Sequence, residues 1–241
     1  MDSFDAFKVS GVIESFVDDL SNWYIRRSRE RVGASYSSNE DRNNFYETTY
    51  FVLVNLMKML APFIPFMADL IFSNLTKEPS VHLADWLDIK FKSDDALVDT
   101  MKGLRMLVEK VHAERKVQAI PVRQPLNSLA TAYSKPSAEL EVIVKDEINV
   151  KIIDWSALKG EEFDIKLDTT LTPDLIEEAK TRELIRTIQS ERKKLGVELD
   201  QKVNITSNWY PDKTELKDMI IKKALIKELN IGDNFKVEKA A

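Results

Sequence analysis

Apolar residues recur at steps of three and four along most of the first 116 residues, the spacing that places them on one face of a helix. A first long helix is predicted from about Phe4 to Val32. Its apolar line consists of Val9, Ile13, Phe16, Leu20 and Trp23. Further helices are predicted over about 42–60, 62–75 and 94–116, with irregular stretches at 33–39 and 77–92. The pattern therefore predicts a helical bundle.

Residue types mark where some of these helices begin. Pro62 and Pro65 interrupt the apolar pattern, but proline suits the first turn of a helix, so a new helix is expected there. Asp94 or Asp95 supplies the N-terminal signal of the last helix of the bundle. Trp86 lies in an irregular stretch and is expected to anchor its loop by packing on the bundle.

The character of the sequence changes at Val117, and prolines with β-branched residues predict an extended edge strand over 120–126. Thr172 and Pro173 are expected to open a helix, as N-cap and first helical residue. The other elements predicted here are strands at 150–154, 163–167 and 200–206, and helices at 136–147, 172–195 and 212–229. No internal repeat is expected. The predicted fold is mainly α, with a helical bundle over 1–116 and a small α+β subdomain over 117–241.

The composition narrows the class of protein. Hydrophobic residues make up 44% of the 241 positions, which is ample for a core. The net charge is −5, so any nucleic-acid surface must be a local patch on an acidic body. Cysteine is absent, and no apolar run reaches the roughly 18 residues that a membrane span needs. Without a basic leader at the start, we expect a soluble cytoplasmic protein that does not associate with membranes.

Four arginines follow the apolar line of the first helix, namely Arg26, Arg27, Arg29 and Arg31. At about 100° per residue, Arg27 and Arg31 continue that line, whereas Arg26 and Arg29 point away from it. We expect Arg27 to pair with a buried carboxylate and to stack on an aromatic ring. Arg26 and Arg29 suit either a solvated face or contact with a polyanion, and the neighbouring Trp23 favours nucleic acid.

A second basic stripe is predicted on the helix over 172–195. It consists of Arg182, Arg186, Gln189 and Lys193, spaced by four, three and four residues. Leu184, Ile188 and Leu195 fall on the other side and are expected to face the core. The stripe suits a solvated face softened by Glu183 and Glu191, or a ridge that contacts phosphates without reading bases.

Three more cations extend this picture. Arg192 and Lys194 widen the stripe. Arg123 lies between Pro121 and Pro125, so its backbone is expected to be rigid. It suits either a structural ion pair or a contact with a nucleotide.

The residues that would carry chemistry are missing. His82 and His112 are the only histidines, and without cysteine they make a metal site improbable. No Ser-His-Asp order and no glycine-rich phosphate loop is present. A complete active site within this chain is therefore not expected.

Several segments together resemble the isoleucyl-tRNA synthetases. In order, they are Asn22–Arg29, Leu60–Phe66, Ser80–Trp86, Val122–Leu126, Glu147–Lys151 and Arg182–Lys193. One such motif is weak, but six in the same order are specific. The resemblance covers nearly the whole chain and implies the anticodon-binding bundle and the C-terminal tRNA-binding part of that family.

The resemblance implies that the chain docks tRNA for isoleucine and holds its anticodon stem. The family's nucleotide signatures, its catalytic and editing domains and the first helix of its bundle are not found here, so ATP and magnesium belong to the parent enzyme and its missing catalytic domain is an expected partner. No cofactor is expected in this chain. The candidate tRNA-contact residues are Trp23, Arg26, Arg27, Arg29, Arg31, Arg123, Arg182, Arg186, Gln189, Arg192 and Lys193. The alternative function is a protein-interaction module whose basic helices meet acidic protein surfaces.

Overall fold

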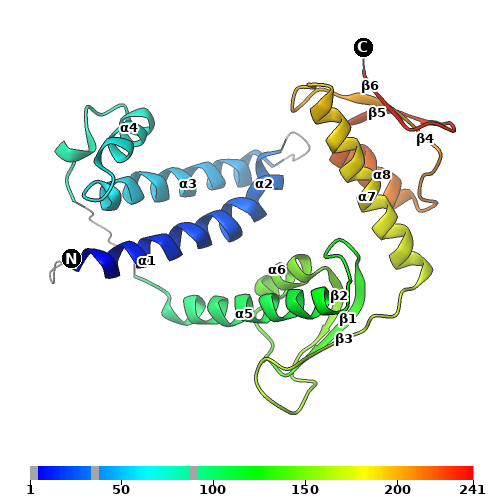
Figure 1. Ribbon diagram of the computed structural model, residues 1–241, viewed down its shortest axis with the longest axis horizontal. Helices are drawn as coiled ribbons and strands as arrows, with labels where there is room; N and C mark the ends of the chain where they lie inside the picture. The colour runs from blue at the N-terminus through cyan, green and yellow to red at the C-terminus, as the bar shows by residue number, and fades with distance from the viewer. Residues whose placement is uncertain (1–4, 34–37, 87–91, 241) are drawn as a thin grey trace. The chain divides into compact units, whose positions relative to one another are not determined.

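The computed structural model describes residues 5–33, 38–86 and 92–240, and the chain forms two compact units, residues 1–91 and 92–241 (Figure 1). The predicted fold class is confirmed, because helices dominate and two small three-stranded sheets lie in the second unit. The sequence places a boundary after Lys116, whereas the division into units falls before the helix Asp95–Val117. The division into a bundle over 1–116 and a subdomain over 117–241 stays a prediction.

Helices build the first unit. They are α1 (Ala6–Asp19), α2 (Arg26–Val32), α3 (Asn39–Leu60) and α4 (Pro65–Thr76), with a π-helical segment η1 (Leu20–Ile25) and a 3-10 turn η2 (Val81–Leu83). The predicted first helix is thus one run of helix whose middle is widened to a π-helix. Pro65 occupies the first turn of α4, as predicted, because its fixed φ suits a helix start.

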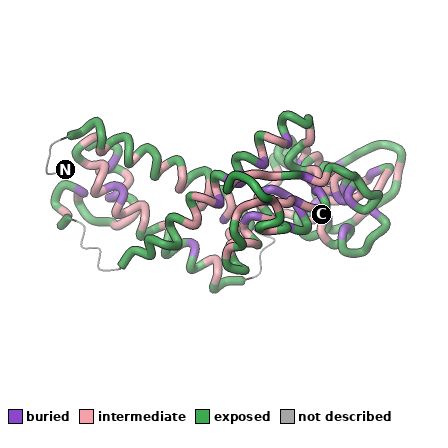
Figure 2. The backbone as a smooth tube through the Cα atoms, turned by 90° about the horizontal axis from the view of Figure 1, so that it is seen from below, coloured by how far each residue is buried: buried purple, intermediate pink, exposed green. Residues whose placement is uncertain are grey.

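The core of the first unit lies between α3, α4 and η2. Its buried residues are Leu56, Met57, Ala68, Phe72 and Val81. The predicted apolar line of α1 is only partly covered: this helix, next to the N mark in Figure 2, has no buried residue, and Phe16 is 42% exposed. The expectation for Trp86 is wrong, since this residue is 57% exposed and does not belong to the described core.

The first half of the second unit is an α/β layer. Its elements are α5 (Asp95–Val117), β1 (Leu126–Thr131), α6 (Ala138–Ile148), β2 (Val150–Asp154) and β3 (Ile165–Leu167). The sheet order is β2-β1-β3, with β2 parallel and β3 antiparallel to β1. Asp94 caps α5 by accepting from the Leu97 N–H, as expected. The edge strand predicted over 120–126 is wrong, because residues 118–125 turn around the buried side chain of Arg115 and the strand begins only at Leu126.

The second half repeats this plan. Its elements are α7 (Pro173–Lys194), β4 (Val203–Ser207), α8 (Thr214–Ala224), β5 (Ile226–Ile231) and β6 (Lys236–Lys239). The sheet order is β5-β4-β6, again with one parallel and one antiparallel neighbour. Thr172 caps α7 and Pro173 opens it, as predicted. The same order of elements thus occurs twice in the second unit, although no repeat was found in the sequence.

The last predicted helix is too long. It ends at Ala224, Leu225 adopts a left-handed φ of 53°, and the chain continues as β5 beside β4. Burial decides this: Ile226 joins Ile185, Ile188, Ile205 and Ile220 in the core that α7 and α8 form on this sheet. Among the described residues, no helix combines the length and the apolar character needed to cross a bilayer.

Candidate nucleic-acid interface

The π-helical segment changes which residue after the apolar line is buried. A π-turn adds one residue to the helix, so positions after it shift by one relative to an ideal α-helical wheel. As a result Ser28 is buried, while Arg27, predicted on the buried line, is only half-buried. Arg27 therefore lies next to the buried position, and its pairing with a carboxylate stays a prediction.

Arg31 has the environment that was predicted for Arg27. Its Nε lies 2.9 and 3.0 Å from the two carboxylate oxygens of Asp41, and its Nη2 lies 2.6 Å from Oδ1. The guanidinium carbon is 5.8 Å from the centroid of the Phe45 ring, which itself stacks on Tyr24. The hydrogen bond to Asp41 raises the pKa of Arg31 above its ordinary value. Arg31 therefore joins α2 to α3, and its predicted contact with RNA is untested.

The other side chains of this cluster point outward to different degrees. Arg26 is exposed, and its Nε donates to the Asn22 carbonyl at 2.6 Å, within the π-helical segment. Arg29 is exposed, as predicted. Trp23 is half-buried at the end of the apolar line. Arg26 and Arg29 are thus the accessible arginines of this cluster.

The stripe on α7 is accessible over most of its length. Arg186 has 67% of its side chain exposed and lies 3.9 Å from the Glu183 carboxylate, so it is only loosely paired. Gln189 is exposed and donates to the Lys223 carbonyl at 2.7 Å, which joins α7 to the end of α8. Lys193 is exposed and forms no ion pair in the part of the chain that the structure describes. Arg186 and Lys193 are therefore the cations best placed to meet a polyanion.

Two of the three residues predicted to face the core from α7 do so, and one does not. Ile188 is fully buried and Leu184 packs against the core, as expected, but Leu195 follows the helix end and is largely exposed. The helix ends at Lys194, and Gly196 turns the chain with a φ of 59°. Leu195 therefore leaves the helical face that the spacing assigned to it.

Arg192 does not lie on the stripe. It is 7% exposed, and its guanidinium donates to main-chain carbonyls, among them that of Gln201 at 2.7 Å. Burial lowers its pKa below the ordinary value. The prediction that Arg192 widens the exposed surface is wrong, because at its position on the wheel α7 packs on the core.

Arg123 lies in a turn and not in a strand. Its Nε donates to Glu183 at 2.9 Å, with both side chains about half exposed. The sequence left open a structural ion pair or a contact with a nucleotide for Arg123, and the structure shows the ion pair. Glu183, expected to soften the α7 stripe, is thus partly neutralised by a cation from the turn at 121–125.

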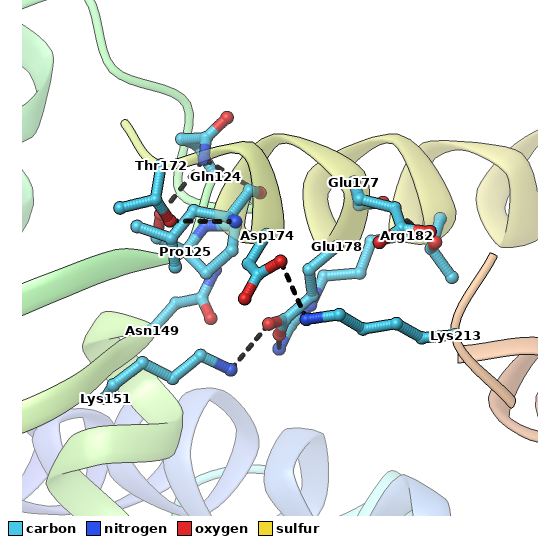
Figure 3. A network of polar contacts seen from close by, with 12 residues as sticks. Gln124, Pro125, Asn149, Lys151, Thr172, Asp174, Glu177, Glu178, Arg182 and Lys213 are labelled. Atoms are coloured by element: carbon cyan, nitrogen blue, oxygen red, sulfur yellow. Dashed lines mark hydrogen bonds and ion pairs between the residues drawn. The ribbon is translucent and has the colours of Figure 1, made fainter. Parts of the chain in front are cut away.

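A network that the sequence did not reveal positions the start of α7 (Figure 3). Glu178 is nearly buried and accepts from Lys151 of β2 at 2.5 Å and from Arg182 at 2.7 Å. Lys213, before α8, pairs with Asp174 at 2.8 Å, which raises its pKa. Arg182 is therefore committed to an internal ion pair, with 37% of its side chain exposed.

The only signal for this network in the sequence is the spacing of Glu178 and Arg182, four residues apart on a helix. A shallow cavity of about 330 Å³ lies beside the network, and Lys151 and Lys213 are among its lining residues. Because both lysines already pair with carboxylates, the cavity lacks the free positive charge that a phosphate group would need.

Replacing Glu178 by glutamine is expected to lower the free energy of unfolding by about 1–2 kcal/mol, since it leaves two partly exposed cations side by side. Burial alone would raise the pKa of Glu178, but Lys151 and Arg182 outweigh it and hold the pKa below the ordinary 4.5. This stabilisation is complete above pH 4.5 and is lost as the pH falls through the lowered pKa. Urea titrations of both proteins between neutral and acid pH measure it. If Glu178→Gln lowered the free energy of unfolding equally at every pH, the ion pairs of Glu178 would not be the source of the stabilisation.

No arrangement for metal chemistry accompanies these surfaces. Within residues 5–33, 38–86 and 92–240, no group of three or more His, Cys, Asp or Glu side chains is placed to hold a metal ion. The chemistry that the described surfaces offer is the attraction of exposed Arg and Lys to a polyanion.

Comparison with known proteins agrees with this geometry. The profile of the family described as "Anticodon-binding domain of tRNA ligase" matches residues 1–130. More than half of the chain is thus covered, and the chain belongs to this family of anticodon-binding domains.

Three similar proteins are all ligases for one amino acid, whereas the family description names tRNA ligases in general. The isoleucine–tRNA ligase of Leifsonia xyli subsp. xyli is 29% identical over 86% of this chain and 25% of its own length. That of Dehalococcoides mccartyi (strain CBDB1) is 32% identical over 85% of this chain and 22% of its own length. Isoleucine–tRNA ligase 2 of Pseudomonas fluorescens is 34% identical over 65% of this chain and 15% of its own length. The chain therefore spans a quarter or less of the length of these relatives.

Proposed function

We propose that this chain is the tRNA-docking part of an isoleucine–tRNA ligase, and that it holds the anticodon stem of the tRNA for isoleucine. The match of residues 1–130 to anticodon-binding domains carries the proposal. The names of the similar ligases support the choice of isoleucine. The expected cytoplasmic location stays a prediction.

The exposed cations support a docking role. Arg26 and Arg29 on one unit and Arg186 and Lys193 on the other are accessible, whereas Arg31 and Arg192 are held by contacts within the protein. Phosphate contacts from such side chains orient a nucleic acid without reading its sequence. In this proposal ATP and magnesium serve the ligation step in the remainder of the enzyme, and this chain contributes tRNA binding without a cofactor of its own.

Fluorescence anisotropy with labelled tRNA transcripts tests the proposal on the whole chain. We expect the transcript for isoleucine to bind more tightly than one whose anticodon stem and loop are replaced, because contacts with that region set the preference. Two further transcripts, for valine and leucine, serve as matched controls. Equal binding of all transcripts, or preferential binding of an acidic protein over tRNA, would contradict the proposal and favour the protein-interaction module.

A further inference from the structure

The two halves of the second unit share more than their order of elements. In each half a long helix is followed by a strand, a shorter helix, a parallel strand and an antiparallel strand (Figure 1). The shorter helices, α6 and α8, both have 11 residues. The loops that follow the long helices, 118–125 and 195–202, are of equal length.

In the first half, a buried arginine joins the loop after the long helix to the end of the shorter helix. Arg115, in the last turn of α5, is 1% exposed. Its Nη1 donates to the carbonyls of Pro121 and Gln124 at 3.2 and 2.9 Å, in the loop after the helix. Its Nη2 donates to the carbonyls of Ile148 and Asn149 at 2.7 and 3.1 Å, at the end of α6.

Arg192 does the same in the second half, from the last turn of α7. Three carbonyls of the following loop accept from it, those of Glu198 at 3.2 Å, Gln201 at 2.7 Å and, without a counterpart around Arg115, Leu199 at 3.4 Å. The carbonyl of Ala224, at the end of α8, accepts at 3.4 Å. Three of these acceptors correspond to acceptors of Arg115: Glu198 to Pro121, Gln201 to Gln124 and Ala224 to Ile148.

The backbone of the loop 118–125 follows the same course as that of the loop 195–202 at the positions next to the helix. In both loops the fourth residue after the arginine has a positive φ, 55° at Ala119 and 59° at Gly196. The next N–H, of Ile120 or Val197, donates back to the carbonyl of the arginine at 2.8 or 3.2 Å.

The shorter helices also end alike. Asn149 and Leu225 both have a φ of 53°, and each accepts from the first N–H of the central strand, at 3.1 Å from Leu126 and 3.0 Å from Val203. A bulky leucine with positive φ is uncommon, so its presence indicates that the surrounding plan imposes this conformation.

The sequence retains a trace of the same correspondence. Glu114–Lys116 and Glu191–Lys193 both read Glu-Arg-Lys, and a glutamine follows nine positions after each arginine. Left-handed helix ends and parallel strand–helix–strand units occur in unrelated proteins for general reasons. Such general preferences do not explain why, in both halves, a buried arginine joins the loop after the long helix to the end of the shorter helix.

We infer that residues 95–167 and 173–239 are two copies of one module, and that the second copy alone presents a surface for polyanions. The second part of the inference rests on the proposed function. Counterparts of the α7 stripe on α5 are Arg105, Glu109, His112 and Lys116. Glu109 stands where α7 has Arg186, so α5 lacks one of the two exposed cations, Arg186 and Lys193, that the α7 stripe offers.

Reciprocal loop exchange tests the first part. In one variant the sequence of 118–125 replaces 195–202, and in the other 195–202 replaces 118–125. The control carries the inserted residues in reversed order. We expect each exchanged loop to fold around the resident arginine, so amide protection of the flanking parallel strands, measured by hydrogen exchange, stays within about tenfold of the original protein in at least one variant. Loss of protection in both variants to the level of the controls would overturn the duplication.

Matched lysines test the second part. Lys116 and Lys193 are both exposed, and each directly follows the buried arginine of its copy. Lys193→Gln is expected to make the log–log salt dependence of tRNA binding shallower by about 0.7–0.9, the value of one phosphate contact, and Lys116→Gln is expected to leave it unchanged. An equal or larger effect of Lys116→Gln would overturn the restriction to the second copy. Failure of the original protein to bind tRNA would refute the proposed function and this second part, while the loop exchange still decides the duplication.

Discussion

Replacing Arg115 by methionine is expected to lower the free energy of unfolding of the second unit by about 3 kcal/mol. Four main-chain carbonyls lose a charged donor, two of these hydrogen bonds are buried, and each hydrogen bond of this kind contributes roughly 1.5–3 kcal/mol. The loss is smaller than their sum, because burying a guanidinium is costly and methionine keeps the apolar contacts of the stem. Burial lowers the pKa of Arg115 to about 10, so the side chain is still charged at neutral pH.

Urea unfolding followed by circular dichroism measures this loss, and hydrogen exchange locates it. We expect faster exchange in the loop 118–125 and at the end of α6, which the arginine joins. Lys116→Met is the matched control, since this neighbouring side chain is exposed and its loss should change stability by less than about 0.5 kcal/mol. Comparable destabilisation by both substitutions would show that Arg115 does not organise this loop.

The double substitution Arg186→Gln and Lys193→Gln is expected to weaken tRNA binding and to make its log–log salt dependence shallower by about 1.4–1.8. Each phosphate contact releases condensed counterions and contributes roughly 0.7–0.9 to the slope. Glutamine forms helix nearly as well as arginine or lysine, so α7 should stay intact. Anisotropy titrations between about 50 and 200 mM salt measure the slope, in the range where this effect is large.

Arg31→Gln provides the contrasting control for that experiment. Because Arg31 is held by Asp41 and by Phe45, we expect it to lower the melting temperature of the first unit and to leave the salt slope unchanged. If the α7 double variant binds tRNA with the original affinity and slope, the stripe is not a phosphate surface. If Arg31→Gln flattens the slope as much, Arg31 contacts RNA in addition to its partner in α3.

The starts of helices could be predicted from the sequence because the signals are local. Asp94 and Thr172 each cap a helix by accepting from an N–H three residues on, and Pro65 opens one. The apolar spacing of α5 predicts a buried side of Leu97, Met101, Leu104, Val108 and Val111. The last three are buried, whereas Leu97 at the start of the helix is 48% exposed. These features depend on residues within one turn of each other, and no distant contact overrules them.

The roles of the arginines could not be predicted in the same way. Arg186 and Arg192 lie on one helix, yet one is exposed and the other buried among carbonyls, because the packing of α7 on its sheet separates their environments. Arg115 drew no attention in the sequence, although it is the largest fully buried side chain of the described residues. Its partners lie in a loop and at the end of another helix, and only folding brings them together.

The sequence by itself determined the helical character of the chain, its helix starts and, through its motifs, its resemblance to a tRNA ligase. Tertiary structure decided where the last helix ends, because burying Ile226 beside β4 outweighs the helical pattern beyond Ala224. It also decided which cations are accessible and that the second unit contains the same plan twice. Spacing along a chain specifies a face of a helix, whereas accessibility and pairing depend on residues far away in sequence that pack against that face.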